Sequence, residues 1–503
     1  MDYSIFKSGS DIRGYGLGDE DAKLYMSDEM ISRCARAFCE WLMSKTGKDI
    51  VRISVGRDCR LSGERIENAV INALGFCRAE IIDCGLSSTP AMFMTTVELG
   101  CDGAVQITAS HHPMDRNGLK FFTRDGGLDG SDIAFLLNSA QNYEPFEVKE
   151  AANVQHVDFM KTYSGILRKM IIDGVNASDA EHPLKGMKIV VDPGNGVGGF
   201  YARDVLAPLG ADVSGSVFLE PDGSFPNHAP NPENAAAMQM ASEACIAAGA
   251  DLGIVFDTDV DRAAIVGRNG LEINRNRLVA LACAVALKKE KGATIVTDSV
   301  TSDGLRDFIT GLGGKHLRFK RGYRNVINKQ IELCNAGVKC PLAMETSGHA
   351  AFAENYFLDD GAYLVTKLII ESAKRAAEGE SLESMIASLE EPVEEKELRF
   401  KILAPDFRAE GEKIISVFEK AAADNPDWTM CDDNYEGVRI NSKKSCGWFL
   451  IRLSVHDPII VLNSESDITG GTRTMCEDVY RCIQTADNIE LIDIFSLKEF
   501  LNK

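Results

Sequence analysis

Apolar and polar positions follow the same order in three separate stretches of the chain. Each stretch opens with a short β-branched run that ends in a turn signal: RISVGRD from Arg52, KIVVDPGNG from Lys188 and ATIVTDS from Ala293. Runs of this kind are typical of β-strands. A segment with helical spacing follows, such as ERIENAVINALG or GLRDFITGLG, and then a second apolar run leads into a polar loop. The recurrence predicts three related α/β units.

The polar loops of the three units are the first candidates for function. They follow the runs GAVQI, GIVF and PLAM, and they read TASHH, DTDVDR and ETSGH. Ligands of α/β sheets bind beyond the carboxyl ends of the strands. We therefore expect the three loops to line one central cleft.

The domain organisation follows from this repeat and from the length. A chain of 503 residues exceeds what one hydrophobic core usually supports. After the acidic stretch EGESLESMIASLEEPVEEKEL, helix-like and strand-like runs alternate without a fourth copy of the pattern. We predict three α/β domains at residues 1–150, 151–266 and 267–390, and a smaller domain of another kind at 391–503.

The DTDVD segment of the second unit is a candidate metal site. It places Asp257, Asp259 and Asp261 at alternate positions directly after a strand-like run, where such residues share a side. Three carboxylates on one side suit a hard cation such as Mg2+. A calcium hand is excluded, because Arg262 and Arg268 stand where its loop needs Gly and Glu. An acidic surface turn is the alternative.

The TASHHPMDRNGLK segment of the first unit is a candidate catalytic loop. Ser110 stands at the mouth of a strand, with His111, His112 and Lys120 close in sequence. A serine nucleophile needs activation and an offset for the charge that develops, and these groups together with a cation can supply both. The segment does not match the GxSxG elbow of hydrolases. A capped turn with solvated histidines is the alternative.

Further polar loops offer donors for a sugar or a phosphate. ETSGH, from Glu345 to His349, combines a carboxylate, a hydroxyl and an imidazole around a glycine, which suits recognition of sugar hydroxyls. Guanidinium, hydroxyl and imidazole groups that suit a phosphate lie in RLSVHDP, in SESDITGGTRT and in SDIRGYG; they belong to Arg452, Ser454 and His456, to Arg473, and to Arg13. Solvated loops are the alternative for each.

The GNGVGG segment matches the GxGxxG pattern of dinucleotide-binding proteins. It follows a strand, and Glu220 stands in the position of the acidic ribose ligand. The interposed DP departs from the direct turn of strand into glycine, and a lone match is weak. A dinucleotide-dependent oxidoreductase is therefore a second hypothesis.

Composition restricts the partners. The net charge of −21, without a dense Lys/Arg block, argues against nucleic acid and anionic membranes. The run LVALACAVAL is about half as long as a membrane helix, and the N-terminus lacks the pattern of a secretory signal. We expect a cytoplasmic protein. Its 14 cysteines form no CxxC pair, which favours reduced, buried thiols over a zinc or redox centre.

Taken together, the segments resemble the α-D-phosphohexomutase family of phosphoglucomutases and phosphomannomutases. In chain order, the similar segments are SDIRG, GRDCRLSG, CGLSSTP, TASHHP, FDTDVDR, FKRGYR, ETSGH and RLSVHDP. The resemblance covers nearly the whole chain. It implies three mixed α/β domains and a C-terminal α+β domain similar to the TATA-binding-protein fold, around a central cleft.

The resemblance also implies an activity. Ser110 would carry a phosphoryl group that completes the coordination of Mg2+ by Asp257, Asp259 and Asp261. Hexose 1-phosphate and hexose 6-phosphate, of mannose or glucose, would then interconvert through a hexose 1,6-bisphosphate that turns over in the site.

The remaining site residues have roles implied by the same resemblance. Lys120 is the first candidate for general acid/base, and the supporting catalytic candidates are His349, His111, Arg13 and Arg262. Substrate contacts are expected from Glu345, Ser347, Lys320, Arg321, Arg452, Ser454 and His456. We expect small hexose phosphates as ligands, and a monomer or a small homo-oligomer.

This sequence departs from the family pattern at three loops. Thr258 and Val260 replace the glycines of the metal loop, and His112 replaces the common Asn of the serine loop. Thr346 occupies a position that varies with substrate in the family, so a phosphoglucosamine mutase is an alternative. A catalytically silent hexose-phosphate-binding protein is an alternative of another class.

Overall fold

A computed structural model of the chain describes residues 2–19, 22–144, 146, 153–454 and 457–503. Two compact units are present. Unit 1 comprises Met1–Val285 and Ser347–Met385, and unit 2 comprises Ala286–Thr346 and Ile386–Lys503. Each unit is described by itself.

The first sheet of unit 1 has eight strands in the described part of the chain, in the order β1-β2-β6-β5-β3-β4-β8 with β7 beside β6. The strands are β1 (Lys7–Ser8), β2 (Asp11–Tyr15), β3 (Arg52–Arg57), β4 (Glu80–Leu86), β5 (Gly103–Ile107), β6 (Arg116–Thr123), β7 (Gly126–Gly127) and β8 (Val154–His156). Strands β3, β4, β5 and β8 are parallel, whereas β6 pairs antiparallel with β5 and β2. The chain therefore reverses directly after β5, at the serine loop.

Helices cover both faces of this sheet. They are α1 (Asp28–Thr46), α2 (Gly63–Phe76), α3 (Thr89–Glu98) and α4 (Gly130–Gln141), after a short 3-10 turn η1 (Tyr3–Phe6). Val55 packs into the core formed with α1, α2 and α4, while the hydroxyl of the preceding Ser54 lies 2.5 Å from that of Thr95 in α3. Because successive strand residues point to opposite faces, α3 lies on the other side of the sheet.

The second sheet of unit 1 has the strand order β12-β11-β10-β9. The strands are β9 (Ile189–Asp192), β10 (Leu252–Phe256), β11 (Ala263–Val266) and β12 (Glu272–Ile273). Strand β10 is parallel to β9 and forms an antiparallel hairpin with β11, so the acidic segment is the turn of this hairpin. The helical segments are α5 (Phe159–Val175), η2 (Val197–Gly199), η3 (Tyr201–Leu206), η4 (Ala207–Leu209), α6 (Ala235–Ala248) and η5 (Arg268–Gly270).

The rest of unit 1 comes from residues 347–385. It contains β16 (Ala350–Phe352) and β17 (Leu358–Asp359), which pair antiparallel, then η6 (Ala353–Asn355) between them, and α10 (Gly361–Ala377). The hydroxyl of Tyr163 in α5 donates to Asp360 at 2.7 Å, which ties α10 to α5. Helix α7 (Arg275–Lys289) carries the chain from unit 1 into unit 2.

Unit 2 contains a parallel group of strands and the C-terminal sheet. Strand β13 (Thr294–Asp298) pairs parallel with β14 (Lys315–Phe319) and β15 (Leu342–Met344), accompanied by α8 (Asp303–Gly311) and α9 (Tyr323–Asn335). The C-terminal sheet has the order β19-β20-β21-β22-β18-β23. Its elements are η7 (Leu382–Ile386), which leads into it, β18 (Glu394–Ile402), α11 (Phe407–Asp424), β19 (Trp428–Met430), β20 (Val438–Ser442), β21 (Gly447–Leu453), β22 (Ile459–Ser466), α12 (Gly471–Ile483), η8 (Ile489–Leu491), β23 (Ile492–Asp493) and α13 (Phe495–Asn502).

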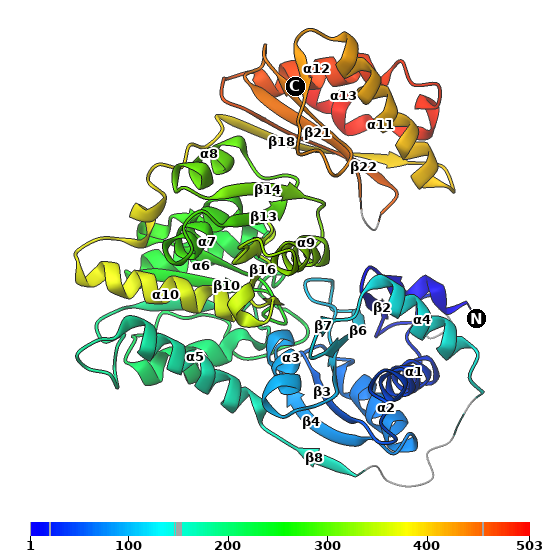
Figure 1. The fold of residues 1–503 in the computed structure, drawn as a ribbon, viewed down its shortest axis with the longest axis vertical. Helices are drawn as coiled ribbons and strands as arrows, with labels where there is room; N and C mark the ends of the chain where they lie inside the picture. Colours follow the sequence, from blue (N-terminus) through cyan, green and yellow to red (C-terminus); the bar gives the residue numbers. More distant parts are fainter. Residues whose placement is uncertain (1, 20–21, 145, 147–152, 455–456) are drawn as a thin grey trace. The chain divides into compact units, whose positions relative to one another are not determined.

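Helices α11, α12 and α13 lie on one face of the antiparallel C-terminal sheet (Figure 1). Their apolar sides form a core with alternate strand residues such as Phe400, Phe449 and Leu462. This differs from the parallel pairing of β13, β14 and β15, as expected for a C-terminal domain of another kind. The predicted α/β fold class is confirmed.

None of the described helices combines the length and the apolar character needed to cross a bilayer. All 14 cysteines are free thiols, and most are buried.

Candidate active site

The serine loop begins where β5 ends. Ser110 is buried and has a positive φ of 48°, which turns the chain sharply back toward β6. Its N–H donates to the hydroxyl of Thr108 at 2.9 Å, and that hydroxyl donates to Asp58 at 2.7 Å. The backbone conformation of Ser110 is thus held by side chains that directly follow strands β5 and β3.

A buried arginine holds the backbone of the serine loop through hydrogen bonds. Arg60 is ion-paired with Asp58 and donates to the carbonyl oxygens of Ser110, His112, Pro113 and Arg116. Sequence reasoning identified GRDCRLSG as a family segment but did not assign this role to Arg60. The guanidinium can bind several carbonyls at once because it carries five donors in one plane.

The acidic loop is a turn, and the turn rather than the pleat of a strand brings its carboxylates together. Val260 has a φ of 66°, a left-handed conformation that favours glycine, and Thr258 packs against the backbone of Gly196. The loop thus keeps a glycine-like backbone at Val260, one of the two positions where a glycine of the family pattern is replaced. Ligand oxygens of Asp257, Asp259 and Asp261 lie within 4.8 Å of one another.

The serine and the acidic loop are in direct contact. The hydroxyl of Ser110 donates to Asp257 at 2.9 Å. Arg262 also reaches both groups, because its Nε donates to Asp257 at 3.1 Å and its Nη2 lies 3.4 Å from the serine oxygen. The two loops come from different sheets of unit 1, so only the fold brings them together.

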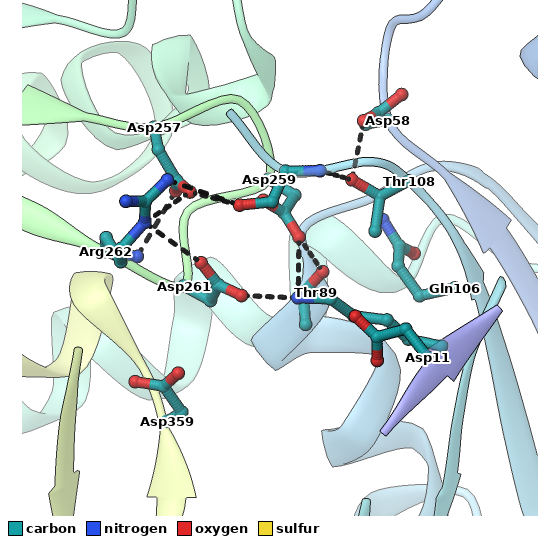
Figure 2. Close-up of polar contacts among 12 residues, drawn as sticks. Asp11, Asp58, Thr89, Gln106, Thr108, Asp257, Asp259, Asp261, Arg262 and Asp359 are labelled. Atoms are coloured by element: carbon teal, nitrogen blue, oxygen red, sulfur yellow. Dashed lines mark hydrogen bonds and ion pairs between the residues drawn. The ribbon is translucent and has the colours of Figure 1, made fainter. Parts of the chain in front are cut away.

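Lys120 and Thr89 hold the other two carboxylates. Figure 2 shows Thr89 beside Asp259. The ammonium of Lys120 lies 2.5 Å from Asp261 and 3.3 Å from Asp259. The hydroxyl of Thr89 donates to Asp259 at 2.5 Å, and its N–H donates to the carbonyl of the same residue at 2.9 Å. Thr89 begins helix α3 and was missed from the sequence, although CGLSSTP was noted as a family segment.

The residues present fit a divalent cation. The Oδ1 atoms of Asp259 and Asp261 are buried and have no hydrogen-bond partner among the described residues. Burial, followed by the negative charges of Asp261 and Asp259, raises the pKa of Asp257 well above its ordinary value. An all-oxygen donor set of this kind suits Mg2+, whose charge would offset the repulsion.

His349 lies beside the same cluster. Burial by itself would lower the pKa of this imidazole. The ion pair with Asp359 and the charge of Asp261 outweigh burial, and the pKa is raised to about 9. His349 is therefore protonated at neutral pH. Asp359 was not identified from the sequence, because it lies at the end of β17, outside the ETSGH motif.

The remaining predicted residues of the first domain surround the serine loop. Arg13 is ion-paired with Asp11 at 2.6 Å and donates to the carbonyl of Thr108 at 3.2 Å. The His111 ring has its Nδ1 3.4 Å from the serine oxygen and stacks on the ring of His112 at 5.0 Å. Ser347, from the predicted third domain, is buried and lies just before β16 in the 347–385 segment of unit 1.

Unit 2 brings a second group of predicted residues together. The N–H of Gly322, directly after Lys320 and Arg321, donates to Glu345 at 2.5 Å. Glu436 links two more of the predicted residues, Arg321 and Arg452. It accepts the N–H of Arg321 at 3.0 Å, and its other oxygen lies 3.7 Å from Nη1 of Arg452.

Part of the predicted phosphate loop, RLSVHDP, lies within the described residues. Arg452 is buried, and burial lowers its pKa from the ordinary value. The hydroxyl of Ser454 accepts the N–H of Asp457 at 3.3 Å. His456 lies outside the described residues. Arg473, the weaker candidate, donates to the carbonyl of Leu501 and lies in α12.

The glycines of GNGVGG serve close packing of the backbone. A Cβ on Gly199 would lie 2.0 Å from the carbonyl oxygen of Leu219, and one on Gly196 would lie 2.8 Å from that of Thr258. The segment lies against the acidic loop, where the N–H of Val197 donates to Thr258 at 2.9 Å. These contacts account for the glycines without a dinucleotide.

Family models match most of the chain. They are those of phosphoglucomutase/phosphomannomutase alpha/beta/alpha domains I, II and III, which match residues 6–142, 169–270 and 274–392. The chain is 30% identical to the phosphomannomutase/phosphoglucomutase of Pseudomonas putida over 433 residues, 86% of each protein. It is 30% identical to the phosphoglucomutase/phosphomannomutase of Thermococcus kodakarensis, covering 84% of this chain and 88% of that one.

A solved structure agrees with these matches. A phosphoglucomutase/phosphomannomutase family protein from Burkholderia thailandensis superposes with a TM-score of 0.78 at 26% identity, covering 97% of this chain and 98% of that one. The order of the matched domains is the order of the repeats read from the sequence. The chain therefore belongs to the phosphoglucomutase/phosphomannomutase family.

Proposed function

We propose that the chain is a phosphohexomutase, which interconverts hexose 1-phosphate and hexose 6-phosphate of mannose, of glucose or of both. The observation that carries the proposal is the contact between the Ser110 hydroxyl and Asp257, inside a cluster of three buried carboxylates. A hydroxyl in that position can carry a phosphoryl group and leave it beside a cation. Family membership supports the same reaction class.

Asp257, Asp259 and Asp261, with the phosphorylated Ser110, are the residues proposed to hold Mg2+. When bound, this ion would neutralise negative charge on the phosphoryl group that is transferred. The other cations of the site, Arg262 among them, act on the same charge. Phosphoryl transfer depends mainly on such positioning and electrostatic stabilisation.

The transfer exchanges one phosphate ester for another. The P–O bond to Ser110 breaks while the bond to the free sugar hydroxyl forms, which gives a hexose 1,6-bisphosphate. Lys120 is proposed to give a proton to the serine oxygen and to accept the proton of the sugar hydroxyl. The bisphosphate then turns over, and its other phosphate returns to Ser110 by the reverse step. Arg13 and the protonated His349 are proposed to support these steps through charge. Burial, followed by the charge of Arg262, lowers the pKa of His111, so its neutral ring is proposed to act through its contact with the serine oxygen.

Recognition of the substrate is assigned to polar side chains outside the serine and metal loops. Glu345 and Ser347 are proposed to bind sugar hydroxyls in either orientation of the bisphosphate. The proposed contacts to the distal phosphate and the sugar ring come from Lys320, Arg321, Arg452, Ser454 and His456. Buried cations such as Arg452 suit a phosphate, because its charge compensates theirs.

A coupled assay tests the reaction and its substrate. Glucose 1-phosphate, mannose 1-phosphate and glucosamine 1-phosphate are compared at saturating Mg2+ with a hexose 1,6-bisphosphate activator. Turnover of glucose or mannose 1-phosphate is expected. Preference for glucosamine 1-phosphate would favour the phosphoglucosamine mutase, and binding without turnover of any of the three would favour the non-catalytic protein.

The serine provides the second test. Ser110→Ala is expected to abolish turnover while hexose-phosphate binding stays measurable by calorimetry. Ser416→Ala, at a helix position whose hydroxyl donates to the carbonyl of Lys413, is the matched control and should keep wild-type activity. Undiminished activity of Ser110→Ala would exclude the phosphoserine mechanism. The four domain ranges, a cytoplasmic location and a monomeric or small oligomeric state remain predictions.

A further inference from the structure

A pocket of about 540 Å3 lies in unit 1, apart from the residues assigned to the mutase site. Helix α5 forms one wall, and the segment from Val197, within GNGVGG, through η3 forms another. Pockets of about 300–1,000 Å3 are the usual size for small-molecule sites. The η3 turn is a π-helix, a rare element that is frequent at functional sites.

The charge of the lining differs from that of the whole chain, whereas its apolar share is similar. Seven of the fifteen lining residues are apolar: Leu86, Met160, Val197, Phe200, Pro208, Leu219 and Pro221. Three lining residues are cations and two are carboxylates, which leaves one net positive charge (3 − 2 = 1) in a chain with a net charge of −21. The cations are Lys161, Arg168 and Arg203, and the carboxylates are Asp158 and Asp204.

The two arginines of the lining differ in their partners. Arg203 is ion-paired with Asp204 at 3.0 Å, whereas Arg168 donates to the carbonyl oxygen of Asp204 and not to its carboxylate. Ser164, also in the lining, is 1% exposed, and its hydroxyl oxygen has no hydrogen-bond partner among the described residues. A buried hydroxyl without a partner costs stability, so its presence in a pocket wall points to a ligand with a polar group.

The pocket is lined by residues of two segments that hydrogen-bond to the acidic loop, one containing Val197 and the other leading from Ser87 to Thr89. Val197 lines it and donates its N–H to the carbonyl of Thr258, inside that loop. Ser87 also lines it, two residues before Thr89, which holds Asp259 through two hydrogen bonds. A ligand in the pocket would thus contact two segments that position the metal carboxylates from behind.

We propose that this pocket is a second ligand site, which binds a small anion with an aromatic or other apolar group and changes the cation affinity of the acidic loop. The apolar walls accommodate the hydrophobic part, and Arg168 and Lys161 attract the anionic group. By linkage, a ligand that changes cation affinity has its own affinity changed by the cation to the same extent.

Binding of 8-anilinonaphthalene-1-sulfonate, a small aromatic anion, tests the site in the full chain. We expect one equivalent per chain by fluorescence titration, with affinity at least tenfold weaker in Arg168→Gln and at least threefold weaker in Lys161→Gln. Lys161 is exposed, so its variant keeps the test valid if Arg168→Gln fails to fold. Lys169→Gln is the matched control, because Lys169 lies on the same helix, pairs with Asp173 and is absent from the lining.

The coupling is measured with Mn2+ in place of Mg2+. Electron paramagnetic resonance titration of the wild type is expected to show an Mn2+ affinity that differs at least threefold with and without the sulfonate. Equal sulfonate binding by Arg168→Gln and wild type, displacement of the sulfonate by glucose 1-phosphate, or an unchanged Mn2+ affinity would each overturn the proposal. None of these measurements requires turnover, so the result is independent of the mutase assay.

Discussion

The hydroxyl of Ser110 donates a hydrogen bond of 2.9 Å to Asp257, although 147 positions separate the two residues in the chain. The serine stands after β5 of the first sheet, and the aspartate stands after β10 of the second. The proposed phosphoryl carrier is therefore already in contact with a proposed cation ligand.

Asp259→Asn should weaken cation binding at least tenfold. The substitution removes one negative charge from the three-carboxylate cluster, and even the loss of an outer partner of a metal ligand typically costs about 10–100-fold in affinity. Calorimetric titration with Mg2+ measures the effect. Asp125→Asn, on an exposed turn of the same unit, is the control and should bind as the wild type does. An unchanged affinity in Asp259→Asn would remove this residue from the ligand set.

Arg60→Met should destabilise unit 1 strongly. The change leaves the buried Asp58 carboxylate without its ion-pair partner and the carbonyls of the serine loop without their guanidinium donor. Removing one partner of a buried ion pair costs about 3–5 kcal/mol. Differential scanning calorimetry should show a lower Tm, and mutase activity should fall because Ser110 loses its support. The exposed Arg124→Met is the control; a variant of Arg60 with unaltered Tm would contradict the bracing role.

His228→Gln should lose stability in a pH-dependent way. Burial lowers the pKa of His228, but the hydrogen bond and charge of Asp192 outweigh burial and raise it above the ordinary value. A raised folded-state pKa gives stability that is complete below the unfolded value, about 6.5, and is lost as pH rises through the folded value. The Tm difference between wild type and variant should therefore be larger at pH 5.5 than at pH 9. A difference that grows with pH would refute this assignment.

Glu436→Gln should strengthen binding of hexose phosphates, if Arg452 binds their phosphate as proposed. The carboxylate lies 3.7 Å from Nη1 of Arg452 and would repel an incoming phosphate. The amide keeps an oxygen that can accept from Ser299 and from the N–H of Arg321. We expect Kd for glucose 6-phosphate to fall about threefold by calorimetry, which corresponds to about 0.7 kcal/mol.

The matched control for this change is Glu477→Gln. Glu477 lies on α12, where it pairs with Arg473 at 3.7 Å, and the control should leave Kd unchanged. Weaker binding in Glu436→Gln would show instead that the carboxylate positions Arg452 productively.

Much of the fold could be predicted from local pattern. The three β-branched runs near Arg52, Lys188 and Ala293 all form strands, because buried strands need continuous apolar side chains. Strands β3 and β13 have neighbours on both sides, whereas β9 is at the end of its sheet. The polar loops that follow the second runs were located correctly for the same reason. The local pattern predicted the wrong backbone geometry for the acidic loop. Its carboxylates meet through a hairpin turn with a left-handed Val260, and not through strand alternation.

The sequence by itself determined the α/β class, the family, and the residue types that a cation and a phosphoryl group require. Only the tertiary structure decided the partners: Arg60 beneath the serine loop, Thr89 on Asp259, Lys120 between two carboxylates and Asp359 on His349. The physical reason is the distance along the chain over which each kind of signal acts. Strand and turn signals act over a few neighbouring residues, whereas these contacts join segments that are distant in sequence or lie outside a recognisable motif, and folding alone sets which charges meet.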